Sequence, residues 1–142
     1  MIGRTFDQLE IGDSSEFSKT ISEADVYLYA GISGDLNPAH INEVYAQGTF
    51  FKNRIAHGML TAGFISAVIG MQLPGPGTIY MGQSLEFLAP VRIGDTVTAR
   101  VEVLEKIDDK KRVRLETICI NQDGTKLISG QAMVSPPRPA AK

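Results

Sequence analysis

The stretch 57–73, HGMLTAGFISAVIGMQL, constrains the fold more than any other feature of the sequence. It is apolar on nearly every face and ends at the breaker PGPG, which is typical of a long helix buried on all sides. A membrane span is the competing interpretation. The stretch falls short of about 18 to 20 uninterrupted apolar residues and contains Thr61, Ser66 and Gln72. We therefore expect a buried helix that needs walls around it.

The period of the pattern changes after this helix. Four strand-like runs separated by turn signals follow at 78–88, 95–107, 111–121 and 126–134, and they predict four consecutive strands in a meander. The second run alternates, and its apolar face consists of Val97, Ala99, Val101 and Val103. One face of the sheet is therefore expected to be buried. A curved antiparallel sheet wrapped around the long helix satisfies both elements, which places the chain in the α+β class.

The N-terminal third predicts a short strand followed by helical pieces. Residues 14–20 favour a strand, and Ser22 with Asp25 is typical of a capping box that starts a helix ending near Gly34. The loop GDLNPAH follows, and a weak helical turn is expected across NEVYA, residues 42–46.

Length and charge narrow the classes of function. The 142 residues fit one domain, expected over 1–135, with a flexible tail over 136–142. Because 14 basic residues are balanced by 16 acidic ones, generic binding to nucleic acid or to an anionic membrane surface lacks its usual driving force. The start of the chain has no apolar signal-peptide region, and a single cysteine forms no internal disulfide, so a cytoplasmic protein is expected. That residue, Cys119, reads as a small buried hydrophobe.

Two side chains of the GDLNPAH loop are candidates for chemistry. Asp35 and His40 lie five positions apart, and Pro38 limits how far the segment between them can relax. In water such groups titrate near about 3.9 and 6.5, so each could accept a proton from the same water at neutral pH. The same residue types also favour ordinary turns, and the loop alone leaves that structural role open.

A second candidate cluster lies where the long helix begins. Backbone N–H groups in the first helical turn have no partner within the helix, and the dipole there favours negative charge. Gly58 would let a ligand approach this end closely, as an oxyanion hole requires. His57 reads more simply as a histidine satisfied at the helix start, and Ser66 by itself as a residue bonding its own helix.

Metal and nucleotide sites are not supported by the sequence. With two histidines, no cysteine pair and no HExxH spacing, the remaining ligand set is Asp35, His40 and His57. Sequence alone does not bring these three together, so no metal is predicted. No GxGxxG or GxxxxGK[ST] string is present, so dinucleotide and P-loop phosphate sites are not predicted either.

Together these motifs resemble one known family. The string GDLNPAH, with Ala46 further on, resembles the signature of the (R)-specific enoyl-CoA hydratases of the MaoC-like, hot-dog superfamily. AHGML at 56–60 opens the long helix as in that family, and 79–87 followed by 90–95 looks like its first sheet hairpin. The resemblance extends from about Phe6 to Val134. It implies a hot-dog fold, with a curved antiparallel sheet around a long central helix, and a homodimer whose sheets join edge to edge.

The resemblance also implies a reaction. The substrate would be a trans-2-enoyl thioester of coenzyme A, and syn addition of water would give the (R)-3-hydroxyacyl-CoA reversibly. Asp35 and His40 would hold and deprotonate the water that attacks C3 and return a proton to C2, with the two roles unassigned. The Gly58 N–H would stabilise the enolate oxygen. Asn37 would hold the loop, and Ser66 would support the catalytic pair. His57 is included in the candidate site with them, as a substrate-binding or supporting residue. No cofactor is implied.

Two other functions fit the same scaffold. A hot-dog acyl-CoA thioesterase would direct water at the carbonyl carbon instead of C3, and a non-catalytic acyl-thioester or protein-binding module would use the turn residues structurally. The sequence leaves the acyl-length preference open. Residues expected to line the tail pocket include Val26, Tyr29 and Leu73.

Overall fold

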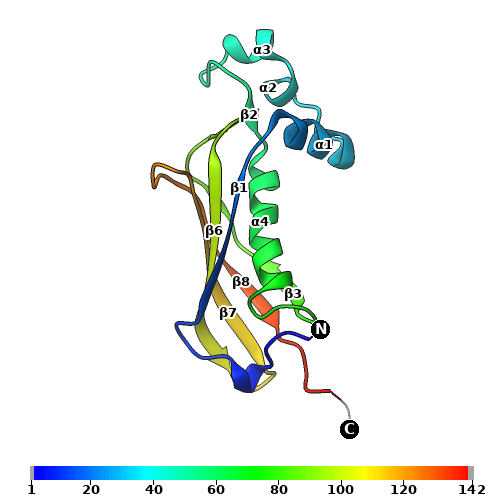
Figure 1. The fold of residues 1–142 in the computed structure, drawn as a ribbon, viewed down its shortest axis with the longest axis vertical. Coiled ribbons are helices and arrows are strands. Elements are labelled where there is room, and N and C mark those ends of the chain that lie inside the picture. Colours follow the sequence, from blue (N-terminus) through cyan, green and yellow to red (C-terminus); the bar gives the residue numbers. More distant parts are fainter. Residues whose placement is uncertain (1, 141–142) are drawn as a thin grey trace.

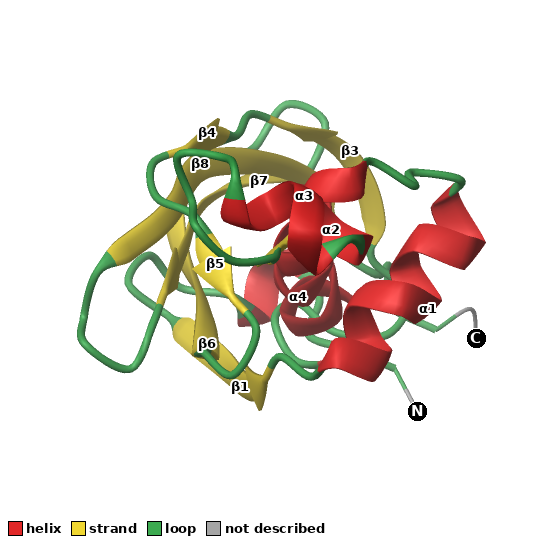
Figure 2. Ribbon diagram, turned by 90° about the horizontal axis from the view of Figure 1, so that it is seen from above, coloured by secondary structure: helices red, strands yellow, loops and turns green. Residues whose placement is uncertain are grey.

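The computed structural model describes residues 2–140 and contains the predicted long helix as α4, Gly58–Met71. Seen from above, α4 is viewed nearly end-on with the sheet curving around it (Figure 2). Its buried residues are Thr61, Phe64, Ile65, Val68 and Ile69. Among the described helices, none combines the length and apolar character needed to cross a bilayer.

The main sheet has six strands in the order β1-β6-β7-β8-β3, and β4 pairs with β8 beside this path. All of its pairings are antiparallel. The strands are β1 (Ser14–Thr20), β3 (Ile79–Gln83), β4 (Glu86–Phe87), β6 (Thr96–Ile107), β7 (Arg112–Ile120) and β8 (Lys126–Ser135). A second sheet pairs β2 (Ile55–Ala56) with β5 (Val91–Arg92). The long elements run side by side along the molecule (Figure 1).

The predicted four-strand meander is wrong at its first step. Only β6, β7 and β8 follow one another as neighbours, whereas the run 78–88 divides into β3 and β4, which both pair with β8. The segment 88–95 is therefore not a hairpin turn. It contains β5, which pairs with β2 instead and lies between β4 and β6 in Figure 2. The expected hairpin from 79–87 into 90–95 is wrong for the same reason.

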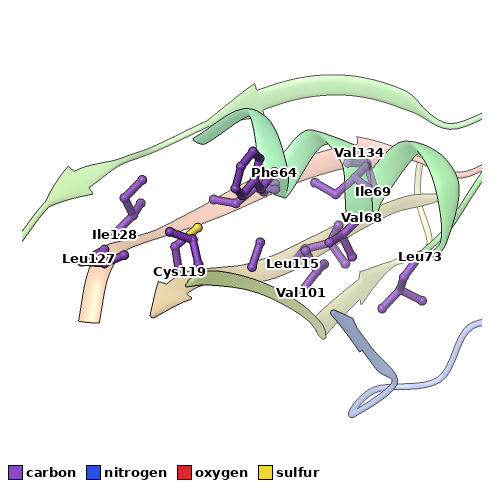
Figure 3. Close-up of a cluster of buried hydrophobic side chains, with 14 of the residues drawn as sticks. Phe64, Val68, Ile69, Leu73, Val101, Leu115, Cys119, Leu127, Ile128 and Val134 are labelled. Carbon is purple, nitrogen blue, oxygen red and sulfur yellow. The ribbon is translucent and has the colours of Figure 1, made fainter. Parts of the chain in front are cut away.

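The core lies between α4 and the concave face of the sheet. The predicted inward face of β6 is confirmed, because Val97, Ala99, Val101 and Val103 are all at most 1% exposed. Phe64, Val68 and Ile69 of α4 lie over Val101 and Leu115 (Figure 3). Burial of these side chains, worth about 1.5–3 kcal/mol each when complete, fixes α4 against the sheet and so fixes where its first turn lies.

Three short helices cover the N-terminal end of α4 (Figure 1). They are α1 (Glu23–Ser33), α2 (Pro38–Ile41) and α3 (Glu43–Gln47), and a 3-10 turn at Phe6–Gln8 precedes β1. The predicted capping box of Ser22 with Asp25 is confirmed, and Gly34 ends α1 with a φ of 81°. Part of the expected GDLNPAH loop is helical instead, because Pro38 occupies the first position of α2, where its missing N–H costs nothing.

The first residues of the expected C-terminal tail pack against the domain. Pro136 and Pro137 are buried, and residues 141–142 of the expected tail lie outside the described residues.

The side chain of Cys119 is fully buried, and burial raises the pKa of its thiol to about 12. The thiol therefore stays protonated at neutral pH and unsuited to nucleophilic chemistry.

Candidate active site

Asp35 lies on the short connection between α1 and α2. The left-handed Gly34 turns the chain out of α1, and the Asp35 N–H donates to Ser33 Oγ at 3.1 Å. Its own Oδ1 accepts the N–H of Asn37 at 3.3 Å, so the carboxylate also closes an Asx-type turn. The side chain is exposed at the mouth of a cavity, and its second oxygen remains available to a ligand.

His40 is held by the start of α2. Asn37 caps this helix, because its Oδ1 accepts the Ala39 N–H at 3.0 Å, which supports the predicted role of Asn37 in loop shape. His40 Nδ1 lies 2.7 Å from the carbonyl oxygen of Ile55. A carbonyl only accepts, so Nδ1 carries the hydrogen and Nε2 carries the free lone pair.

The surroundings of His40 favour its neutral form. Burial lowers its pKa below the ordinary 6.5, and the neighbouring His57 lowers the pKa further, whereas the Ile55 carbonyl and the Asp35 carboxylate offset part of this. A neutral imidazole with Nε2 unprotonated is a base that can accept a proton from water.

His57 joins the two candidate clusters. It is the N-cap position of α4 and is 2% exposed. Its Nε2 lies 2.9 Å from the carbonyl oxygen of Asp35, and its ring stacks on that of His40 with centroids 3.8 Å apart. One titrating atom from each of Asp35, His40 and His57 lies within 4.8 Å of the others, so the structure brings together the three residues that the sequence could not.

This cluster is poorly arranged for a shared metal ion. The donor types would suit zinc, which binds imidazole nitrogen at about 2.0–2.1 Å in the plane of the ring. The rings of His40 and His57 are stacked with only 30° between their planes. Lone pairs lying in two stacked planes do not converge on one ion at that distance, so the prediction of no metal is retained on geometric grounds.

Gly58 occupies the first position of α4 and faces the same cavity. A Cβ placed on it would lie 2.6 Å from two ring carbons of Phe87, so glycine is required for this aromatic ring to pack against the helix start. The N–H of Gly58 belongs to the first turn, where helix amides have no partner within the helix. An oxygen that gains negative charge would be stabilised there.

The cavity that unites these groups has a volume of about 460 Å³. Asp35, His40, His57 and Gly58 all line it, and the other lining residues are apolar and include Phe51, Met59, Phe87, Leu88, Leu127 and Ile128. A largely apolar pocket with a few convergent polar groups is typical of a small-molecule site. The sequence missed these apolar residues, because they come from segments far apart and share no period.

Other predicted residues lie elsewhere. Ser66 is exposed on α4, two turns beyond Gly58, and does not line the cavity. Within one chain, therefore, it is not brought to Asp35 and His40. Val26 and Leu73 are fully buried in the core, and Tyr29 contacts the ring of His57 with centroids 4.7 Å apart but does not line the cavity. The expected lining by these three residues is wrong for this cavity.

The fold and the site together are those of a hot-dog protein in which Asp35 and His40 lie beside the start of the central helix. Residues 7–122 match the family model described as the MaoC like domain, and the chain belongs to this family.

Similar proteins match this chain over most of their length. The chain is 58% identical to an (R)-specific enoyl-CoA hydratase of Rhodospirillum rubrum, over 93% of this chain and 91% of that protein. It is 48% identical to a 3-hydroxybutyryl-CoA dehydratase of Methylorubrum extorquens, over 94% and 84%. The unliganded R-hydratase of Pseudomonas aeruginosa superposes with a TM-score of 0.91 at 44% identity, covering 99% of this chain and 93% of that one. The hot-dog fold expected from the sequence is confirmed.

Proposed function

We propose that this protein catalyses the reversible, (R)-specific hydration of trans-2-enoyl-CoA to (R)-3-hydroxyacyl-CoA. The observation that carries the proposal is the convergence of the Asp35 carboxylate, the unprotonated Nε2 of His40 and the start of α4 on one cavity. Enzymes with this activity are among the relatives of the chain. The substrate and product are polar thioesters, which suits the cytoplasmic location expected from the sequence.

The geometry suits the addition of water across a conjugated double bond. A water held between Asp35 and His40 loses a proton to this pair as its oxygen bonds to C3 of the enoyl group. The electrons of the C2–C3 double bond move onto the thioester oxygen, where the helix-start amide of Gly58 stabilises the enolate. The pair then returns a proton to C2. Both the oxygen and the proton come from one side of the substrate, which accounts for syn addition.

The direct test is incubation of the protein with crotonyl-CoA while two signals are followed. Hydration removes the ultraviolet absorbance of the conjugated double bond and leaves the thioester intact, and we expect this signal with (R)-3-hydroxybutyryl-CoA as the product. Release of free thiol would instead show hydrolysis, and tight binding without either signal would show a binding module. Either of these outcomes would overturn the proposal.

Gly58→Ala is expected to lower kcat/KM by up to about 10²-fold, the size of effect that follows from a displacement of about 1 Å in a catalytic site. The added Cβ would lie 2.6 Å from the Phe87 ring, so the ring or the first turn of α4 must move. Since Phe87 is 54% exposed, its ring has room to move, and we expect a small change in melting temperature. Steady-state kinetics and thermal melts measure the two effects.

A matched control is Gly31→Ala in α1, where a Cβ meets nothing within 4 Å. This variant should keep the wild-type rate and gain slightly in stability, because alanine favours helix over glycine by about 1 kcal/mol. A Gly58→Ala protein that melts much earlier yet turns over normally would make Gly58 a packing residue only.

We further propose that the protein is a homodimer joined through the outer edge of β3. This strand ends the sheet order, and an edge strand offers unpaired backbone groups for pairing with another strand. Ile79 and Met81 on β3 are 64% and 43% exposed, and Met71 at the end of α4 is 72% exposed. A second copy paired along β3 would cover this apolar surface and extend the sheet.

Met81→Glu is the test of this interface. A buried carboxylate facing its symmetry copy would repel it, so we expect the mass measured by light scattering to fall from that of a dimer to that of a monomer. Ile11→Glu is the control, since Ile11 is 68% exposed but precedes β1 at the other edge. A wild-type protein that is monomeric at micromolar concentration would refute the dimer.

A further inference from the structure

His57 has hydrogen bonding that its position alone does not explain. A side chain at the N-cap commonly accepts a bond from the first turn of its helix, but His57 makes no such bond. It is buried and reaches back to the connection between α1 and α2, where its Nε2 lies 2.9 Å from the carbonyl oxygen of Asp35. Because that oxygen only accepts, Nε2 carries the hydrogen and donates it.

The two histidines are therefore held in opposite tautomers. His40 carries its hydrogen on Nδ1, and His57 carries its hydrogen on Nε2. This leaves Nδ1 of His57 with a free lone pair, and that atom has no hydrogen-bond partner among the described residues. A buried polar atom without a partner is unfavourable by about 1–3 kcal/mol. The case for a role of His57 therefore rests on the contacts that its ring and its Nε2–H make.

The ring of His57 also contacts the catalytic base. It stacks on His40 with centroids 3.8 Å apart, and it contacts Tyr29 of α1 at 4.7 Å. The His57 side chain thus contacts the Asp35 main chain, the His40 ring and α1. His57 is also the residue immediately before Gly58. The helix-start amide and the acid–base pair come from separate segments, and His57 is the side chain that contacts both halves of the pair.

We propose that His57 is a positioning residue, which sets the separation of Asp35 and His40 from each other and from the helix-start amide. The inference rests on the proposed hydratase function. The Nε2–H bond holds the Asp35 main chain, and the stacked ring holds the plane of the His40 imidazole. Alignment of this kind dominates the rate once the groups are present, since misplacement by about 1 Å costs about 10²-fold.

Three substitutions separate hydrogen bonding from packing. His57→Phe keeps a ring against His40 but removes the donor, His57→Gln places an amide N–H near the position of Nε2, and His57→Asn has the same amide one methylene short. We expect kcat to fall about 10- to 100-fold in the phenylalanine and asparagine variants with KM changed less than about threefold. The glutamine variant should recover most of the loss.

A role in packing alone predicts the reverse order, with phenylalanine best and the two amides equally poor, and that result would overturn the proposal. If the phenylalanine variant does not fold, the glutamine and asparagine pair still decides between the two. Thr61→Val is the control. Thr61 is 0% exposed, lies one turn further along α4, and has a side-chain oxygen without a partner within residues 2–140. Because Thr61 does not line the cavity, its replacement should leave kcat within about twofold of wild type.

A readout independent of activity is available because the chain contains two histidines. In protein labelled with 15N-histidine, we expect one Nδ1–H and one Nε2–H tautomer near pH 8, and the Nε2–H signal should disappear in His57→Gln. An Nδ1–H tautomer for His57 would exclude its bond to Asp35 and overturn the inference, whatever the enzyme does. A wild-type protein with the expected tautomers but no hydration of crotonyl-CoA would instead refute the proposed function.

Discussion

Asp35→Asn is expected to lower the rate of crotonyl-CoA hydration by about 10²- to 10⁴-fold, the usual contribution of a positioned acid or base. Asparagine keeps an oxygen where Asp35 Oδ1 accepts the Asn37 N–H, so the turn into α2 is preserved. What it loses is the negative charge that, in the proposed mechanism, orients the water and accepts its proton. The substitution therefore separates the chemistry of Asp35 from its part in the turn.

The control measurements follow from this separation. The melting temperature of Asp35→Asn should match that of wild type within about 2 °C, because less than about 0.5 kcal/mol is expected at an exposed site that keeps its bond. Asp109→Asn removes an exposed carboxylate from the turn between β6 and β7 and should leave the rate unchanged. A folded Asp35→Asn protein with a near-normal rate would remove Asp35 from the mechanism.

Local signals predicted most of the elements, because each depends on neighbours in the sequence. The capping box at Ser22, the stop at Gly34 and the alternation in 97–103 all act within a few residues, and all are confirmed. The pairing of β3 was predicted wrongly because it depends on a partner, β8, about 50 positions later. Periodicity identifies a strand, but it does not identify the neighbour of that strand.

The candidate site also contains contacts that the sequence predicts and contacts that it does not. Asp35, Asn37 and His40 share one short segment, so their proximity could be predicted from spacing and from the stiffness of Pro38. The approach of His57 to Asp35 depends on how the connection between α1 and α2 packs on α4, and that of Phe87 to Gly58 depends on how β4 packs there. No periodicity or motif in the sequence marks these contacts. The interpretation of His57 as a satisfied helix-start residue is therefore wrong in part, because one of its nitrogens has no partner among the described residues.

His40→Ala is expected to cause a loss as large as that of Asp35→Asn, about 10²- to 10⁴-fold. The variant removes Nε2, the atom with the free lone pair, from a ring that lines the cavity. It leaves a space beside the stacked His57 ring. Since His40 is only partly buried, added imidazole can enter that space. We therefore expect millimolar imidazole to restore part of the rate in His40→Ala. It should restore nothing in Asp35→Asn, which serves as the control.

The assignment of His40 as the base also predicts the direction in which kcat/KM changes with pH. Burial lowers the pKa of His40 below 6.5, so Nε2 stays unprotonated at neutral pH, and kcat/KM of wild type should fall only as the pH drops through that lowered value. In His40→Ala the rescued rate should instead follow the pKa of the added imidazole, because the base is now a solute. A His40→Ala protein that melts early and gains nothing from imidazole would show that His40 supports the structure rather than the proton transfer. An acidic limb above pH 6.5 in wild type would contradict the assignment of a neutral, desolvated imidazole as the base.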